Sequence, residues 1–230
     1  IGILGNAVDH DRHPAAGRKI LAKNKWSLLW GAPRSRDEQG LWYGPAAFQQ
    51  LIPHLYRSAL DEATRFLRPT AGTAVLDLYS GVGGSLRQWR EAGADSLGVE
   101  LGGEAVACAR LNVPGMQVLR GTCQTRLPQL REFSRALPHA TPRLAYLNPP
   151  RTGLERPVAD WLTQSFRPRR VAYLSCSAGT LRRDLEIFNQ QGYSVDRITP
   201  YDFFPRTYHV ETLALLSREP SGTVHPPAGN

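Results

Sequence analysis

From Thr73 onward, short apolar runs rich in β-forming residues alternate with segments of helical periodicity. The run TAVLDL, residues 73–78, is followed by the helical SLRQWREAG and then by the strand-like DSLGVE. MQVLRG, RLAYLNPP and RRVAYLSC continue the series, each with a helical segment after it. Strands that alternate with helices indicate an α/β fold with a mostly parallel, doubly wound sheet.

The last two apolar segments, YSVDRITPYDFF and HVETLALLS, follow one another without a helical segment between them. Consecutive strands joined by a short loop pair antiparallel. The sequence therefore predicts a sheet of seven strands with an antiparallel C-terminal strand. A chain of 230 residues is long enough to bury one sizeable core of this kind.

Three segments of different composition suggest the domain boundaries. Residues 1–45 hold polar loops around two short aromatic runs, WSLLW and LWYG, which predict a β-hairpin within a short N-terminal β-rich appendage. Residues 46–218 carry the alternating pattern and open with a helix over QQLIPHLYRSALDEATRFL. Residues 219–230 have the composition of a disordered tail. The sequence opens on Ile1 rather than Met, which is compatible with a preceding domain outside it.

The charge balance favours a nucleic-acid partner. The formal net charge is +8, and arginine carries nearly all of the positive charge because lysine occurs only at Lys19, Lys23 and Lys25. Arginine suits bidentate contacts with phosphate and stacking on bases. A genome rich in G and C would also enrich arginine, without any such ligand.

The cysteines and the apolar runs indicate a cytoplasmic protein. Cys108, Cys123 and Cys176 form neither a disulfide framework nor a CxxC metal site, so we expect a reducing compartment and no metal. We assign Cys108 and Cys123 to the core. No apolar run approaches the roughly 20 residues that span a bilayer, and no secretory signal pattern opens the chain. We therefore expect no contact with a membrane. We also expect the protein to be a monomer.

The segment DLYSGVGG, residues 77–84, lies between the first strand and its helix. Gly81 and Gly83 let the backbone approach a ligand closely, and Glu100 ends the next strand, where a carboxylate can accept hydrogen bonds from ribose hydroxyls. NAD enzymes favour GxGxxG, but Leu86 stands in place of the third glycine here. The DxxxGxG form instead favours S-adenosyl-L-methionine, which has no pyrophosphate to seat. The alternative is a tight turn that binds nothing.

Three further segments are predicted to meet at the same edge of the sheet. NPPRTGL ends the fourth strand, YLSCS ends the fifth, and FPRTYHVET enters the last. The carboxyl ends of parallel strands line the ligand crevice of such sheets, so Asn148 and Cys176 converge there with the glycine-rich loop. The last strand is antiparallel and begins at that edge, so Glu211 is predicted to face Cys176. A cysteine at a strand end can present a thiolate, although most free cysteines simply pack in the core.

With these motifs the sequence resembles the RNA 5-methyluridine methyltransferases that use S-adenosyl-L-methionine. Their signatures are a DxxxGxG loop, a DPPRxG strand end, a YxSCNP-type cysteine segment and an FPxTxHVE segment. The resemblance covers about residues 46–217. It implies a Rossmann-like seven-stranded methyltransferase sheet, S-adenosyl-L-methionine as the methyl donor, and an rRNA or tRNA as the partner, methylated on carbon 5 of a uridine.

By that resemblance Cys176 is the nucleophile that adds to carbon 6 of the pyrimidine, and Glu211 is the base that removes the proton from carbon 5. The chemistry agrees, because carbon 5 of uracil is a poor nucleophile until a covalent adduct activates it. The family's FxQxN segment falls on Phe48 and Gln50, which would stack on a flipped base and hydrogen bond to its edge. The residues assigned to the cofactor are Gln50, Asp77, Tyr79, Gly81, Gly83, Glu100 and Asn148. Those assigned to the substrate are Phe48, Gln50, Asn148, Arg151 and His209.

Departures from the family pattern keep three alternatives open. Asn148 replaces the family aspartate, Ile52 replaces the asparagine of FxQxN, and Ser177-Ala178 replaces Asn-Pro. An asparagine can accept or donate a hydrogen bond, so cytidine carbon 5 is one alternative target. NPPR also approaches the NPPY signature of exocyclic-amine methyltransferases, although Arg151 cannot stack as an aromatic ring does. The third alternative is a noncatalytic RNA-binding relative.

Overall fold

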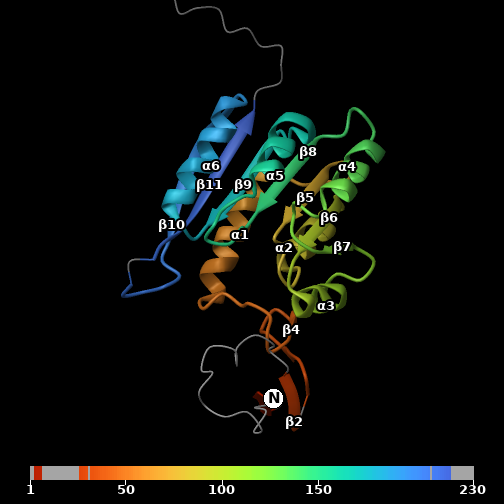
Figure 1. Cartoon of the computed structure of the whole chain (residues 1–230), viewed down its shortest axis with the longest axis vertical. Helices are drawn as coiled ribbons and strands as arrows, with labels where there is room; N and C mark the ends of the chain where they lie inside the picture. Colours follow the sequence, from red (N-terminus) through yellow and green to blue (C-terminus); the bar gives the residue numbers. More distant parts are fainter. Residues whose placement is uncertain (1–2, 7–25, 31, 208, 219–230) are drawn as a thin grey trace, which may run out of the picture.

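The computed structural model describes residues 3–6, 26–30, 32–207 and 209–218. Its centre is a seven-stranded sheet in the order β10-β11-β9-β8-β5-β6-β7 (Figure 1). The strands are β5 (Ala74–Leu78), β6 (Asp95–Glu100), β7 (Gln117–Arg120), β8 (Arg143–Leu147), β9 (Arg170–Ser175), β10 (Tyr193–Tyr201) and β11 (Glu211–Arg218). Strands β5 to β9 are parallel, and β11 runs antiparallel to both β9 and β10. The predicted seven strands and the antiparallel last strand are confirmed. That strand lies inside the sheet rather than at its edge.

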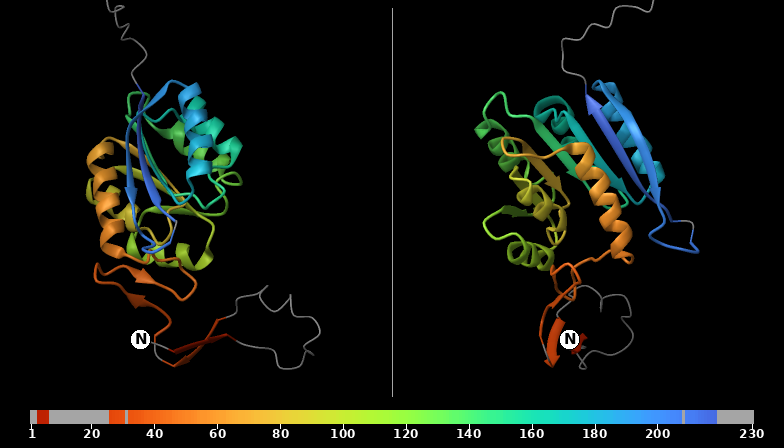
Figure 2. Two further views of the ribbon diagram at one scale, coloured as in Figure 1. Left: turned by 90° about the vertical axis from the view of Figure 1, so that its left-hand side faces the viewer. Right: turned by 180° about the vertical axis from the view of Figure 1, so that it is seen from behind.

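Helices cover both faces of the sheet (Figure 2). They are α1 (Pro53–Leu67), α2 (Gly84–Glu91), α3 (Gly103–Asn112), α4 (Leu127–Ala136), α5 (Arg156–Trp161), which continues as a π-helical turn over Leu162–Phe166, and α6 (Ala178–Gln190). Side chains of α1, α2 and α3 pack into one buried cluster, and those of α4, α5 and α6 into another. This is the doubly wound arrangement that alternating strands and helices predict.

Helix α1 begins later than its periodic pattern predicts. The pattern indicates a helix from Gln49, but the first helical residue is Pro53. Proline has a φ fixed for the first helical position and needs no hydrogen-bond acceptor there. Phe48 and Gln50 therefore lie in the segment that approaches the helix. The helix ends at Leu67, and Arg68 follows in the left-handed conformation.

The predicted hairpin between WSLLW and LWYG is wrong. WSLLW forms β2 (Trp26–Trp30), which pairs with β1 (Ile3–Asn6), whereas β4 (Trp42–Tyr43) pairs with β3 (Ser35–Arg36). The Asp37 carboxylate accepts hydrogen bonds from the backbone N–H groups of Gln39 and Leu41, at 2.9 and 2.8 Å. A side chain that bonds the backbone two residues ahead favours a tight turn, so β4 pairs with the segment directly before it.

One asparagine attaches this β3–β4 hairpin to the rest of the molecule. Asn112, at the end of α3, accepts a hydrogen bond from Trp42 N at 2.7 Å and donates to Trp42 O at 3.1 Å. It also donates to the carbonyl of Val82, in the glycine-rich loop, at 2.8 Å. Figure 1 shows β4 beside α3 accordingly. The Asn112 side chain thus bridges the hairpin, the helix and the loop, and Arg87 on α2 adds a hydrogen bond from Nη1 to Gln39 O at 3.0 Å.

Two further sequence expectations concern the C-terminal tail and membrane-spanning helices. The predicted disordered tail, residues 219–230, lies outside them. Within the described part of the chain, none of the helices has the length and apolar character needed to cross a bilayer.

We expect Asn112→Ala to loosen the β3–β4 hairpin without unfolding the sheet. The variant leaves the Trp42 N–H without its side-chain acceptor, a loss worth about 1–3 kcal/mol of local stability. Hydrogen exchange measured by mass spectrometry should accelerate in residues 34–43 and stay unchanged in residues 74–78. Asn189→Ala, on the exposed surface of α6, is the control. Equal protection of residues 34–43 in both variants would contradict the role given to Asn112.

Candidate active site

The alternation of side chains along the strands places the predicted reacting residues on one face of the sheet. Tyr146, Leu174 and Leu213 belong to the buried cluster under α1. Side chains two residues apart point to the same face of a strand. Asn148, Cys176 and Glu211, each two residues from one of these three, therefore project on the α1 face at the end of the sheet where the parallel strands finish.

Cys176 and Glu211 are neighbours across two paired strands. The register of β9 with β11 pairs Leu174 with Leu213 and Ser175 with Thr212, so Cys176 and Glu211 occupy the next positions along. Glu211 is buried, with 4% of its surface exposed, whereas Cys176 is half-buried. The structure thus brings together the two residues that the sequence predicts to face each other.

Burial disfavours the ionised forms of Cys176 and Glu211, and the positive charge of Arg151 favours them. Burial raises the pKa of Glu211 to about 7, and the Arg151 guanidinium lowers it. The pKa of the Cys176 thiol is raised, first by burial and then by the negative charge of Glu211, while Arg151 again acts to lower it. A positive charge close to a thiol and a carboxylate favours the ionised form of each. The site thus combines a thiol and a carboxylate with a cation whose charge acts on both.

The glycine-rich loop has the backbone conformation that its sequence predicts. Gly81 and Gly83 have φ angles of 55° and 86°, and Tyr79 before them also has a positive φ of 64°. A Cβ on Gly83 would lie 3.2 Å from the Cβ of Ala109 on α3. The loop therefore needs glycine at residue 83 for conformation and for close packing, and at residue 81 for conformation alone.

Glu100 braces this loop. Its two carboxylate oxygens accept hydrogen bonds from Gly81 N at 3.0 Å and from Gly102 N at 2.6 Å. The predicted place of Glu100 at the end of β6 is confirmed. Its carboxylate oxygens keep further lone pairs, so the bracing leaves room for a hydroxyl donor from a ligand.

Asp77 and Tyr79 are directed to protein partners. Asp77 is fully buried and accepts a hydrogen bond from the indole N–H of Trp89 at 2.7 Å, and burial raises its pKa to about 7. The Tyr79 hydroxyl donates to Glu155 at 3.1 Å. One carboxylate oxygen of Asp77 thus supports α2, whereas the other, Oδ1, is buried and makes no hydrogen bond of ordinary geometry.

A cavity opens between the β3–β4 hairpin, the approach to α1, the glycine-rich loop and the end of β8. The predicted residues that line it are Phe48, Gln50, Tyr79, Gly81 and Asn148, and Tyr146 lines it as well. Phe48 is 70% exposed, so its ring is available for stacking. His209 lies apart, in the loop before β11, with its ring edge-on to Phe204 at 6.1 Å between centroids.

Two buried polar atoms of this cavity test whether a cofactor fits. The side-chain oxygens of Gln50 and Tyr146 are inaccessible to solvent and make no hydrogen bond of ordinary geometry, although the Tyr56 side chain lies beside the Tyr146 hydroxyl. Such atoms cost about 1–3 kcal/mol each unless something pairs with them. S-adenosyl-L-methionine carries ammonium, carboxylate and hydroxyl groups that can pair with an amide oxygen and a phenol, so the residues fit it. Sequence reasoning missed Tyr146, although its place two residues before Asn148 on the same strand face was a usable signal.

Elsewhere, the described residues contain no cluster of three or more His, Cys, Asp or Glu side chains that could hold a metal ion. Cys108 and Cys123 are buried in the core, as the sequence predicts.

Comparison with known proteins gives consistent results. A family model described as tRNA (Uracil-5-)-methyltransferase matches residues 47–219. A Lactobacillus johnsonii protein described as an uncharacterized RNA methyltransferase is 31% identical, over 94% of this chain and 48% of that protein. The Escherichia coli 23S rRNA (uracil(747)-C(5))-methyltransferase RlmC is 31% identical, over 78% of this chain and 46% of that protein. The chain thus spans about half the length of the curated relatives it matches.

Solved structures show the same fold. The Pyrococcus abyssi tRNA (uracil-54, C5)-methyltransferase, solved with S-adenosyl-L-homocysteine, aligns with a TM-score of 0.63 and 25% identity, over 81% of this chain and 45% of that one. The methyltransferase domain of bacterial CtHen1-C aligns with a TM-score of 0.52 and 13% identity, which concerns the fold alone. The predicted Rossmann-like methyltransferase sheet is confirmed.

Tyr146→Phe is expected to weaken binding of S-adenosyl-L-homocysteine about fivefold, because it removes one hydrogen bond worth about 1 kcal/mol from the cavity wall. Isothermal titration calorimetry measures the change. Tyr193→Phe is the matched control, since Tyr193 is a buried phenol of the same kind on β10, outside the cavity. Equal dissociation constants for the two variants would show that Tyr146 does not contact the ligand.

Proposed function

Because the chain belongs to the tRNA (uracil-5-)-methyltransferase family, we propose that it methylates carbon 5 of a uridine in rRNA or tRNA with S-adenosyl-L-methionine as the donor. The observation that carries this proposal is the place of Cys176, directly after β9, beside Glu211, the first residue of the adjacent β11, with the charge of Arg151 acting on both. Residues 46–218 would form the methyltransferase domain and residues 1–45 an N-terminal appendage. We expect the protein to act as a monomer in the cytoplasm.

The cofactor would occupy the cavity beside the glycine-rich loop. Gly81 and Gly83 would allow close backbone approach, Glu100 would accept from ribose hydroxyls, and Gln50 and Tyr146 would pair with the amino-acid end. When bound there, S-adenosyl-L-methionine supplies an electrophilic methyl group.

The side chains on the α1 face would activate the base. The Cys176 thiolate adds to carbon 6 of uracil, so that the electron pair of the carbon 5–carbon 6 double bond becomes nucleophilic at carbon 5. Arg151 favours the thiolate that this addition requires. Once carbon 5 carries the new methyl group, the Glu211 carboxylate removes the proton that remains on carbon 5. The carbon–sulfur bond then breaks, the double bond re-forms, and the thiolate leaves with its electron pair.

Recognition of the base would use the exposed segment before α1 and the end of β8. Phe48 would stack on a flipped uracil, as aromatic residues do with unstacked bases. The Asn148 amide can donate to a carbonyl oxygen of uracil while its oxygen accepts from the N3 proton. The relatives RlmC and the Pyrococcus abyssi enzyme are described as acting on uracil, which supports uridine over cytidine as the target.

Cys176→Ala is expected to abolish methyl transfer to RNA, because no adduct can form at carbon 6. Tritium transfer from labelled S-adenosyl-L-methionine to total RNA measures the activity, and nucleoside mass spectrometry identifies the product. Cys108→Ala, which changes a buried thiol of the core, should keep the activity. Methylation that survives Cys176→Ala would overturn the mechanism, whereas 5-methylcytidine or an N-methylated purine as product would instead identify one of the alternative targets.

Glu211→Gln is expected to trap a covalent RNA–protein complex, because the adduct forms but carbon 5 keeps its proton. A band of reduced mobility on a denaturing gel, sensitive to nuclease, measures it. If Glu211→Gln turns over as fast as the parent protein without a trapped complex, another group is the base.

Adduct decay in the parent protein is expected to depend on the ionisation of Glu211. The carboxylate is the active form and its pKa is raised to about 7, so the rate should rise with pH up to about 7 and level off above it. Below that point it should fall about tenfold per pH unit. Single-turnover decay of the adduct between pH 5.5 and 8.5 gives the profile, and a flat profile would exclude Glu211 as the titrating base.

A further inference from the structure

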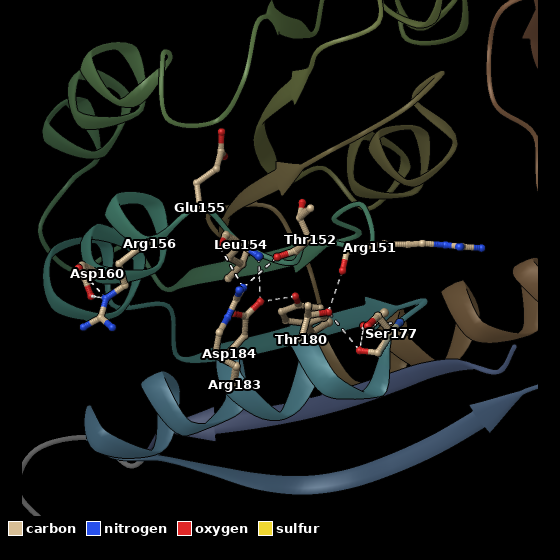
Figure 3. A network of polar contacts seen from close by, with 12 residues as sticks. Arg151, Thr152, Leu154, Glu155, Arg156, Asp160, Ser177, Thr180, Arg183 and Asp184 are labelled. Atoms are coloured by element: carbon tan, nitrogen blue, oxygen red, sulfur yellow. Dashed lines mark hydrogen bonds and ion pairs between the residues drawn. The ribbon is translucent and has the colours of Figure 1, made fainter.

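A fully buried aspartate joins the loop after β8 to helix α6 (Figure 3). One carboxylate oxygen of Asp184 accepts hydrogen bonds from Leu154 N at 2.8 Å and from the Tyr173 hydroxyl at 2.7 Å. The other accepts from Arg183, at 2.9 Å from Nε and 2.7 Å from Nη2. The carboxylate thus ties together β9, α6 and the NPPRTGL loop.

Arg183 extends this attachment along the loop. Its Nη2 donates to the carbonyl of Thr152 at 3.0 Å and to that of Leu154 at 3.3 Å. The acid and the arginine therefore bind both donors and acceptors of the loop backbone, which fixes the path of the loop as well as its distance from α6.

The sequence is adapted to this close approach at one position. Gly153 has a φ of 73°, and a Cβ there would lie 2.5 Å from Asp184 Oδ2 and 2.6 Å from Arg183 Nη2. Any side chain at residue 153 would push the loop away from the pair. The glycine of NPPRTGL is thus required by what the loop contacts.

Thr180 connects the same loop to the residue that follows the nucleophile. Its hydroxyl lies 3.1 Å from the carbonyl oxygen of Arg151 and 3.2 Å from that of Ser177. In Figure 3 the Arg151 side chain extends from this point away from Asp184. The backbone of Arg151 and the start of α6 are therefore held at a fixed separation.

We propose that Asp184 and Thr180 are positioning residues, which hold the Arg151 backbone against the start of α6 and so keep its guanidinium where its charge acts on the Cys176 thiol and the Glu211 carboxylate. The inference rests on the proposed function, in which these two groups react. Arg151 is an exposed residue of a loop, so the place of its charge depends on the place of its backbone. A loop released from α6 would spend part of its time with the guanidinium displaced, and the thiolate would lose electrostatic support.

The test measures thiol reactivity and needs neither RNA nor cofactor. Alkylation of Cys176 by iodoacetamide is followed as a function of pH, and peptide mass spectrometry separates Cys176 from the buried Cys108 and Cys123. Arg151→Ala should raise the pH midpoint of alkylation. Thr180→Val should raise it by a smaller amount, with alkylation about threefold slower below the midpoint for a shift of about half a pH unit.

The matched control is Thr163→Val, because the Thr163 hydroxyl is buried and bonds only within its own helical segment, to Ala159 and Asp160. It should leave the midpoint unchanged. In the Arg151→Ala background, Thr180→Val should have no further effect, since the charge it positions is gone. Asp184→Asn should act like Thr180→Val and more strongly where it folds, as checked by circular dichroism.

Three outcomes would overturn the proposal. They are an unchanged midpoint in Arg151→Ala, a Thr180→Val midpoint equal to that of Thr163→Val, or an equal Thr180→Val shift with and without Arg151. The Thr180 series decides the question even if Asp184→Asn does not fold. Failure of the proposed function would appear separately, as absence of methylated RNA with the parent protein.

Discussion

The arrangement of the reacting end depends on the buried carboxylate of Asp184. Two loops that leave adjacent parallel strands are not held at a fixed separation by the hydrogen bonds of the sheet. A buried charge is stable only when it is paired and hydrogen bonded, and Asp184 obtains its partners from β9, α6 and the loop after β8 at once. The hydrogen bonds to this one carboxylate therefore fix the relative positions of three elements. Of these, the loop after β8 carries Arg151, and β9 ends directly before Cys176.

The electrostatics of the site follow from placing a half-buried thiol beside a buried carboxyl group. Burial opposes ionisation of both Cys176 and Glu211, the charge of Glu211 also opposes ionisation of the thiol, and Arg151 favours both anions. In the proposed reaction the sulfur becomes a neutral thioether when the adduct forms. Arg151 then acts on the Glu211 carboxylate alone, at the step in which that carboxylate is proposed to act as a base.

The sequence predicts both the sheet and the proximity of Cys176 and Glu211. Strands that alternate with helices are parallel, and an antiparallel strand begins at the edge where its parallel neighbours end. Sequence reasoning missed two local signals: Asp37, which closes the turn between β3 and β4, and Pro53, at which α1 begins. It did not reach the contacts of Asn112 with Trp42 and of Trp89 with Asp77, because these partners are distant in sequence. Nothing local in the sequence distinguishes an aspartate that binds an indole from one that faces a ligand.

The insertion of β11 between β9 and β10 has a consequence for the order of folding. β11 follows every other strand of the sheet in the sequence, yet β10 has no neighbour in the sheet except β11. A chain emerging during synthesis can form the parallel strands and present the thiol of Cys176 before β11 exists. Glu211, the first residue of β11, reaches the thiol only when that strand enters the sheet. The proposed nucleophile and the proposed base thus come together only when the last strand joins the sheet, so completion of the fold also completes the proposed catalytic pair.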